Sequence, residues 1–431
     1  MMKKMMSTGL AAALVLSMAA CGGNSTGSAT ADTGSAGGQS TAADAQSTAS
    51  SAEGATAEFV IGGMGPLTGS AASYGISVKQ GSEIAIKEIN EAGGVNVGGT
   101  VYSLKLEFAD DEATEDKAVS AYNSLMDKNI QALVGATTTG CCMAIADLTM
   151  ADNLLVVTPS GSGVDCVKNP NAFRICFTDT LQGNTLAEFA MNDMGVKNVA
   201  VLYSNSSDYG TGIKDGVVSK VEELGGTVVA EEAFGDADVD FNSQLTKIKG
   251  TDAEVIIVCG YYQAATYITK QAADMGLDIP FLGSDGWDGV LGTVTDASTV
   301  EGAIFLSSFF SADTQENVAN FVSEYEAAYN ATPDQFAADA YDAVYVVKAA
   351  MEKAGSIESD AMIAAMTEIS VDGLTGDGIS FTPEGEPNKG AKFIQIKDGA
   401  YTVYGSDSAD ASAADESAAS ETAAADESAA E

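Results

Sequence analysis

The stretch FVIGGMGPLTGSAASYGISVKQGSEIAIKEINE, residues 59–91, contains two different apolar patterns in close succession. Residues 59–62 form a short apolar run that ends at the glycine pair Gly62-Gly63, which is typical of a buried strand. Residues 80–91 follow a helical period, in which Ile84, Ile86 and Ile89 help to form one apolar face. A buried strand followed by an amphipathic helix is the repeating unit of a parallel sheet, so this stretch predicts the α/β fold class.

The same alternation continues along the chain in two series. The first series predicts further strands at 101–108, 132–135 and 154–157. The second series predicts strands at 199–203, 227–229 and 255–258, with helices at 213–224 and 264–275 between them. Two doubly wound lobes are therefore expected. In such sheets ligands bind beyond the carboxyl ends of the strands, so the loops after the strands are expected to carry the function.

The two ends of the chain differ from this central part. Residues 1–20 begin with Lys3 and Lys4, continue with an apolar run and end in two alanines before Cys21, which predicts a signal peptide with a lipoprotein-like cleavage site. Diacylation of Cys21 would anchor the protein to the outer face of the membrane; an ordinary signal peptide followed by a chance cysteine is the alternative. Residues 21–57, rich in Ser, Thr, Ala and Gly, predict a disordered tether, and residues 405–431 an acidic disordered tail.

Composition excludes several classes of function. The 431 residues include 20 lysines and arginines against 61 acidic residues, a net charge of −41 that would repel nucleic acid. The chain contains no histidine, which argues against histidine-dependent catalysis and against zinc sites, and no cofactor is expected. Five cysteines follow Cys21, at positions 141, 142, 166, 176 and 259; in an oxidising compartment they predict one or two disulfides and at least one free thiol, without defining the pairing.

Several loops resemble those of the leucine/isoleucine/valine-binding family of periplasmic receptors, over about residues 59–404. The signature begins with Gly65-Pro66-Leu67-Thr68-Gly69, Tyr74-Gly75 and Gly81, and continues with the run at 88–96. Later motifs follow in the family's order: Asp110-Asp111, Asp208-Tyr209-Gly210, Asp240-Phe241, Gly260-Tyr261-Tyr262, the run at 283–287 and Ala340-Tyr341-Asp342-Ala343.

This resemblance implies a type I periplasmic-binding fold whose lobes close over a ligand by hinge motion. It implies a first lobe at 58–178 plus 310–375, a second lobe at 179–309 plus 376–404, and three crossings that form the hinge. It also implies a monomer that delivers its ligand to the permease subunits of an ABC transporter and catalyses no reaction. The chain contains no phosphate-binding GxxxxGK[ST] motif, so ATP hydrolysis would belong to that partner.

An amino acid zwitterion needs donors at its carboxylate and acceptors at its ammonium. The threonines at 137–139 follow a buried strand and precede a predicted helix, so their hydroxyls and free N–H groups could hold a carboxylate. The resemblance implies that Thr139 is a hydroxyl ligand and that Ser160 and Ser162 grip the ligand from the next loop. Helix capping by the threonine and an ordinary Ser/Gly turn are the alternatives.

The second predicted lobe would supply an acid and several aromatic side chains. The resemblance implies that Asp285 pairs with the ammonium and that Tyr261 reaches the carboxylate, and the interval between them fits adjacent parallel strands. An isolated aspartate in such a turn is more often a turn former. Tyr74 and Tyr209 match aromatic positions that line the family's binding site, and Trp287 lies two residues beyond Asp285, so all three could form an aromatic wall. Core packing or a contact at the rim is the alternative for each.

Three further alternatives concern the function. Arg174, the single arginine, could clamp a carboxylate, but a structural ion pair is the favoured interpretation. A sensory receptor for amino acids or amides could use the same binding site. A hydrolase based on Asp110 and Asp111 is disfavoured, because adjacent carboxylates at a strand end point to opposite faces. The sequence does not distinguish leucine, isoleucine and valine from another small amino acid or an amide, since one methylene contributes only about 1–3 kcal/mol.

Overall fold

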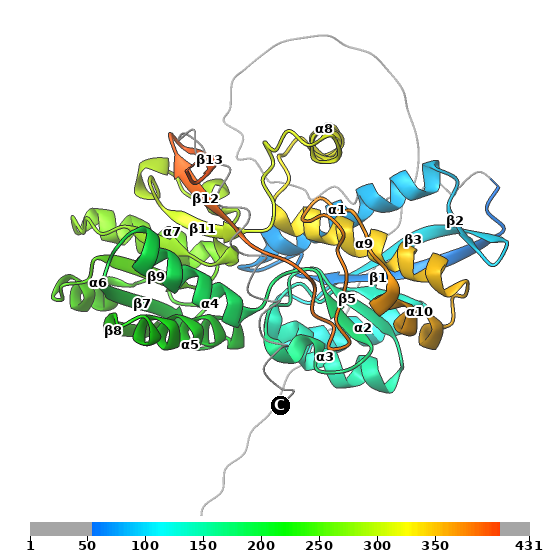
Figure 1. Cartoon of the computed structure of the whole chain (residues 1–431), viewed down its shortest axis with the longest axis horizontal. Coiled ribbons are helices and arrows are strands. Elements are labelled where there is room, and N and C mark those ends of the chain that lie inside the picture. Colours follow the sequence, from blue (N-terminus) through cyan, green and yellow to red (C-terminus); the bar gives the residue numbers. More distant parts are fainter. Residues whose placement is uncertain (1–53, 406–431) are drawn as a thin grey trace, which may run out of the picture. The chain divides into compact units, whose positions relative to one another are not determined.

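Two β-sheets organise residues 54–405, the part of the chain that the computed structural model describes (Figure 1). The first sheet contains β1 (Ala57–Gly65), which pairs in parallel with β3 (Thr100–Asp110) and with β4 (Ala132–Val134). Its full strand order is β2-β3-β1-β4-β5-β6, where β2 is Val95–Val97, β5 is Leu155–Thr158 and β6 is Ala172–Arg174. Only β2 is antiparallel to its neighbour.

The second sheet has the order β13-β12-β11-β10-β9-β7-β8. Its parallel strands are β7 (Asn198–Ser204), β8 (Thr227–Phe234), β9 (Val255–Cys259), β10 (Phe281–Gly283) and β11 (Ile304–Ser307). The strands β12 (Lys392–Lys397) and β13 (Ala400–Val403) are antiparallel additions at one edge. Two mostly parallel sheets with helices between their strands confirm the predicted fold class.

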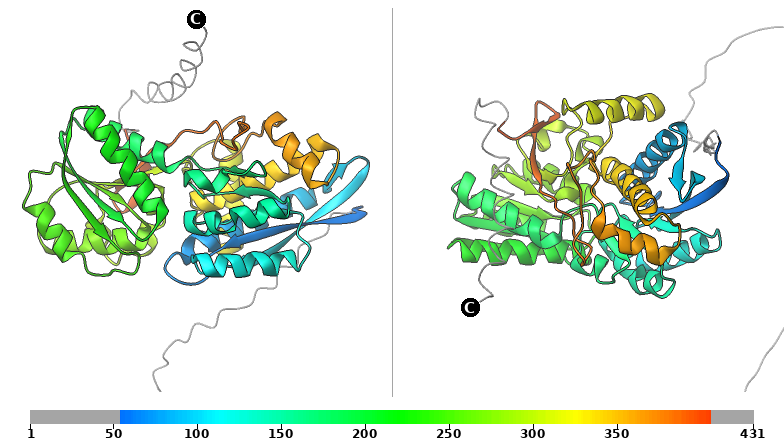
Figure 2. Two further views of the ribbon diagram at one scale, coloured as in Figure 1. Left: turned by 90° about the horizontal axis from the view of Figure 1, so that it is seen from below. Right: turned by 45° about the vertical axis from the view of Figure 1, so that its right-hand side comes forward.

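Helices cover both sheets (Figure 2). We call the first sheet with its helices the first lobe; these helices are α1 (Ala72–Glu91), α2 (Glu115–Met126), α3 (Thr139–Ala151), α9 (Gln335–Ala354) and α10 (Ser359–Ala365). The second lobe contains α4 (Asp179–Glu188), α5 (Asp208–Glu223), α6 (Asn242–Lys249) and α7 (Tyr262–Asp274), while α8 (Glu316–Tyr329) packs on α1. Single turns complete the structure: η1 (Val164–Val167), η2 (Phe189–Asp193), η3 (Asp285–Trp287), η4 (Val290–Gly292), η5 (Ala297–Thr299) and η6 (Met366–Glu368).

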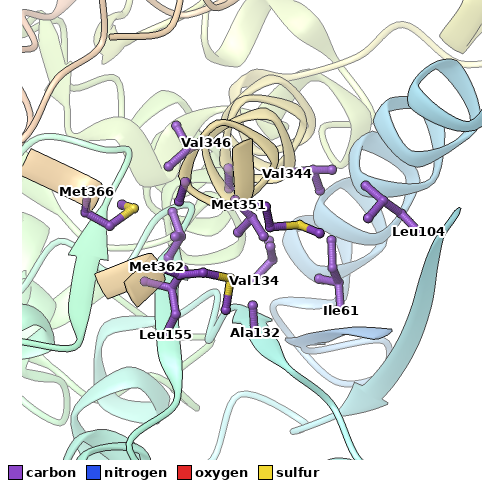
Figure 3. Close-up of a cluster of buried hydrophobic side chains, with 14 of the residues drawn as sticks. Ile61, Leu104, Ala132, Val134, Leu155, Val344, Val346, Met351, Met362 and Met366 are labelled. Carbon is purple, nitrogen blue, oxygen red and sulfur yellow. The ribbon is translucent and has the colours of Figure 1, made fainter. Parts of the chain in front are cut away.

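Packing in the core of the first lobe explains why the sequences of its strands are so apolar. Apolar side chains of β1, β4 and β5, such as Ile61, Val134 and Leu155, meet Val344 and Met351 of α9 in one buried cluster (Figure 3). Strands that are buried on both faces read as continuous apolar runs, which is what the sequence shows at 59–62 and 132–134. The predicted strands and helices of both series are confirmed, although α1 begins at Ala72 and not at residue 80.

The chain passes between the two sheets three times. It leaves the first sheet after β6, returns after β11 to form α9 and α10, and re-enters the second sheet at β12. Residues 308–391 therefore return to the first lobe although they lie between two neighbouring strands of the second sheet. We call residues 366–391, which lead back to the second sheet, the third crossing.

The cysteines do not pair as expected. All five cysteines within residues 54–405 are free and buried, so the expectation of one or two disulfides is wrong. Three of them, Cys141, Cys142 and Cys166, lie in one apolar cluster with residues of α2 and β5, where a reduced thiol packs as a small apolar group. Cys259 lies in the apolar core of the second lobe. Cys21, the signal peptide and residues 406–431 lie outside the described residues, and none of the helices between 54 and 405 is long and apolar enough to cross a membrane.

Gly81 is required by the contact between α1 and α9. A Cβ atom at this position would lie 2.0 Å from the carbonyl oxygen of Ala337, which is backbone and cannot rotate away. We expect Gly81→Ala to destabilise the fold by about 2–3 kcal/mol, a fall in melting temperature of roughly 3–4 °C. Gly140→Ala in α3 is the matched control, because its Cβ would meet nothing closer than 3.7 Å; helix propensity predicts a small gain in stability. Equal melting temperatures for the two variants would contradict the packing argument.

Candidate functional site

A small cavity lies where the carboxyl ends of strands from both sheets meet. Its lining residues come from both lobes: Tyr74, Thr137, Thr138, Thr139, Ser160, Tyr209, Tyr261, Asp285, Gly286 and Phe336. The threonines follow β4, Ser160 follows β5, Tyr261 follows β9 and Asp285 follows β10. Six of the eight residues that the sequence predicted as ligand-binding therefore line one cavity. Its volume is about 10 Å³, close to the space that a single water needs.

The first lobe presents hydroxyl groups and the N-terminus of a helix. The Ser160 hydroxyl donates to the carbonyl oxygen of Thr137 (2.6 Å), and the hydroxyls of Thr139 and Ser162 lie 3.3 Å apart. Thr138 occupies the N-cap of α3, but its side chain caps no N–H group, and its buried hydroxyl has no hydrogen-bond partner among the described residues. This side of the cavity thus offers hydroxyl donors and the positive end of a helix dipole, which suit a carboxylate.

The second lobe presents a buried acid held in place from several sides. The Asp285 carboxylate, in a residue only 4% exposed, accepts a hydrogen bond from the Tyr209 hydroxyl (2.5 Å). Its backbone N–H donates to Oε1 of Gln182 (3.0 Å), and its carbonyl accepts from Nε2 of Gln335 (2.9 Å). The acid is therefore fixed in its orientation and exchanges little with solvent. Burial raises the pKa of Asp285 to about 6, although the Tyr209 hydrogen bond lowers it.

A second buried acid, Asp179, lies behind the cavity beside Ser162, and the sequence does not mark it. This residue begins α4, is 2% exposed, and its backbone N–H donates to the carbonyl oxygen of Ser162 (3.0 Å). Its Oδ1 has no hydrogen-bond partner among the described residues. Burial raises the pKa of Asp179 to about 8, and repulsion by Asp285 adds to this effect. In the sequence Asp179 follows the N-cap Thr178 and reads as an ordinary acidic residue in the first turn of a helix, so no signal marked it.

Aromatic rings form the wall between these two polar sides. Tyr209 stacks on Tyr261 with ring centroids 4.9 Å apart, and Tyr74 packs against Phe336 at 4.2 Å. The Tyr74 hydroxyl donates to the carbonyl oxygen of Gly286, which connects α1 of the first lobe with the loop after β10. Phe336, which the sequence did not indicate, contributes because α9 begins beside the cavity. Such a wall suits an aliphatic side chain.

Two of the predicted residues do not line the cavity. Ser162 is fully buried behind it, where it contacts Thr139. Trp287 lies in the core of the second lobe: its ring covers Gly283, and its Nε1 donates to the carbonyl oxygen of Val258 (3.3 Å). The single turn η3 directs Asp285 toward the cavity and Trp287, two residues later, away from it. For Trp287 the structure thus supports the core-packing alternative.

Most of the chain is similar to proteins of a known family. A family model described as periplasmic binding protein matches residues 58–400. The chain is 32% identical to Leu/Ile/Val-binding protein homolog 3 of Brucella melitensis over 312 residues, which cover 72% of this chain and 83% of that protein. It is 31% identical to Leu/Ile/Val-binding protein BraC3 of Rhizobium johnstonii over the same coverage.

Solved structures agree with these sequence relatives. The branched-chain amino acid transporter substrate binding protein LivJ of Streptococcus pneumoniae, solved in complex with isoleucine, has a TM-score of 0.74 and 29% identity. That comparison covers 80% of this chain and 98% of LivJ. The leucine binding protein LivK of Thermotoga maritima has a TM-score of 0.73 and 26% identity, covering 80% of this chain and 97% of LivK.

Proposed function

This chain belongs to the periplasmic binding protein family. We propose that it is an extracytoplasmic receptor that captures a small α-amino acid, with a preference for branched side chains, for an ABC importer. One observation carries the proposal: hydroxyls and a helix N-terminus on one side of the cavity face a buried carboxylate on the other. A carboxylate and an ammonium held on one small molecule satisfy both sides at once. The relatives whose names give Leu, Ile and Val as ligands support the choice of side chain.

Ligand entry would require the lobes to separate. The cavity of about 10 Å³ is too small to admit an amino acid as it stands. The three crossings allow a hinge, and a ligand that contacts both lobes binds the closed form better than the open form. We infer that the permease subunits recognise this closed form. Members of the family bind their ligands, and we propose that this chain likewise catalyses no reaction.

The proposed location outside the cell rests on the N-terminal sequence. Lys3, Lys4, the apolar run and Cys21 fit a signal peptide followed by lipidation, which would anchor a receptor near its membrane partner. Mass spectrometry of the protein purified from membranes tests this directly: we expect a diacylated Cys21 at the N-terminus. A mature N-terminus at another residue would exclude the lipid anchor and leave the binding function unaffected.

The amino acid itself is tested by thermal shift and calorimetry. We expect leucine, isoleucine or valine, at about 100 times its dissociation constant, to stabilise the protein by about 2.7 kcal/mol, a rise in melting temperature of roughly 4 °C. The screen includes threonine, alanine, acetamide and the decarboxylated analogue isopentylamine. Isopentylamine keeps the ammonium and the side chain but offers no carboxylate to Thr139, so it is expected to fail. Stabilisation by the amide alone, or by none of these compounds, would contradict the proposed ligand class.

A further inference from the structure

A buried guanidinium holds the turn that carries two of the predicted ligand residues. Arg174, the single arginine of the chain, is fully buried. Its Nη1 donates to the carbonyl oxygens of Gly161 (2.8 Å) and Gly163 (3.0 Å), and its Nη2 donates to that of Val164 (3.2 Å). Three hydrogen bonds of one side chain thus end on the backbone of residues 161–164.

These hydrogen bonds set the direction in which the turn faces. The carbonyls of Gly161 and Gly163 both point at the guanidinium, while the carbonyl oxygen of Ser162, between them, accepts from the backbone N–H of Asp179 (3.0 Å). With the backbone of the turn held in this way, the Ser162 hydroxyl lies 3.3 Å from that of Thr139, and Ser160, two residues earlier, lines the cavity. The guanidinium itself does not line the cavity, so its influence on a ligand is exerted through this turn.

The opposite side of Arg174 is fixed to the third crossing. Its Nε lies 3.0 Å from Oε2 of Glu386, and its Nη2 donates to Oε1 of the same carboxylate (3.1 Å). The Arg174 backbone N–H donates to the carbonyl oxygen of Gly385 (3.1 Å). Gly385 has a φ of +83°, and a Cβ there would lie 2.3 Å from the carbonyl oxygen of Ala172, so this close approach requires glycine. The structural ion pair expected for Arg174 is therefore present, and it joins the turn to the third crossing.

We propose that Arg174 is a positioning residue for ligand binding, which orients the turn at 160–164 toward the cavity and joins it to the third crossing through Glu386. This inference rests on the proposed function, since it concerns the same cavity. Lysine cannot replace arginine in this role, because the planar fork of the guanidinium reaches three carbonyls and a carboxylate at once, while an ammonium acts as a compact point charge.

The test uses the full chain and compares Arg174→Lys with a control variant that also removes hydrogen bonds of a buried side chain. Asn90→Ala is the control: Asn90 is also buried, and its amide exchanges two 2.8 Å hydrogen bonds with the backbone of Leu104, away from the cavity. Melting temperatures and dissociation constants for isoleucine are measured for both variants, well below their melting temperatures. We expect Arg174→Lys to raise the dissociation constant at least tenfold and Asn90→Ala to raise it less than threefold, even where Asn90→Ala melts at the lower temperature.

The outcomes separate this inference from the proposed function. Wild-type protein that binds no amino acid would refute the proposed function. If the wild-type protein binds, two results would refute the positioning role alone. One is an unchanged affinity in Arg174→Lys, and the other is a loss of affinity that follows the melting temperature in both variants. If Arg174→Lys does not fold, Glu386→Gln replaces it, because the Glu386 side chain is 32% exposed and its loss is better tolerated. That variant is expected to weaken binding about threefold to fivefold, and unchanged binding would again refute the role.

Discussion

Replacing Asp285 with asparagine is expected to weaken amino acid binding at least about thirtyfold. The carboxylate is buried, and the structure places it across the cavity from the hydroxyls and helix N-terminus of the first lobe. Asparagine keeps the shape of the side chain and can still accept from the Tyr209 hydroxyl, but it removes the charge that would pair with an ammonium. Loss of one partner of a buried charge pair costs about 2–5 kcal/mol, which corresponds to a factor of roughly 30 to several thousand in affinity.

Asp288→Asn provides the matched control for this prediction. Asp288 is three residues away and similarly buried, but its carboxylate accepts from the Gln335 backbone (3.0 Å) and does not line the cavity. Calorimetric titration with isoleucine should therefore show little change for Asp288→Asn and no measurable binding for Asp285→Asn at micromolar protein concentration. Wild-type affinity in Asp285→Asn would remove this carboxylate from the proposed site.

Amino acid affinity is expected to increase steeply with pH between about 6 and 8. Burial raises the pKa of Asp285 to about 6 and that of Asp179 to about 8, so below these values the acids are neutral and attract an ammonium weakly. A bound ammonium favours the ionised carboxylates, and binding therefore releases protons. If binding requires Asp179 to lose its proton, the dissociation constant falls roughly tenfold for each unit by which the pH rises toward the pKa of Asp179.

The stability of the ligand-free protein is expected to change in the opposite direction. For an acid whose pKa is raised by folding, the stabilisation is complete below the unfolded pKa near 3.8 and is lost as the pH rises through the folded value. The melting temperature without ligand should thus fall from pH 5 to pH 8, while the increase produced by isoleucine should grow. Asp179→Asn should flatten the pH dependence of affinity between pH 6 and 8. Calorimetry in buffers of different ionisation enthalpy measures the released protons directly, and proton release of zero at pH 7 would contradict the linkage.

Much of this structure could be predicted because the relevant signals are local. Continuous apolar runs such as 132–134 mark strands buried on both faces, and the loops after those strands lead directly to Thr139 and Asp285. The remaining features depend on packing between distant parts of the chain. Phe336 lines the cavity only because α9 begins beside it, whereas Asp179, at the start of α4, lies behind the cavity against Ser162. Trp287 points into the core because η3 directs it away from the cavity. The sequence pattern does not reveal the start of α1 at Ala72, because glycine and serine in its first turns weaken the helical pattern.

The tightness of the cavity has a kinetic consequence. Side chains from both lobes line it, and Tyr74 of α1 is hydrogen-bonded to the loop after β10 directly beside it. An amino acid bound as proposed would contact both lobes, so we expect its residence time to be set by how often the lobes separate. Ligands that differ by a methyl group would then dissociate at similar rates, because each waits for the same separation of the lobes. A membrane partner that holds the lobes apart would accelerate the release of every ligand to the same extent.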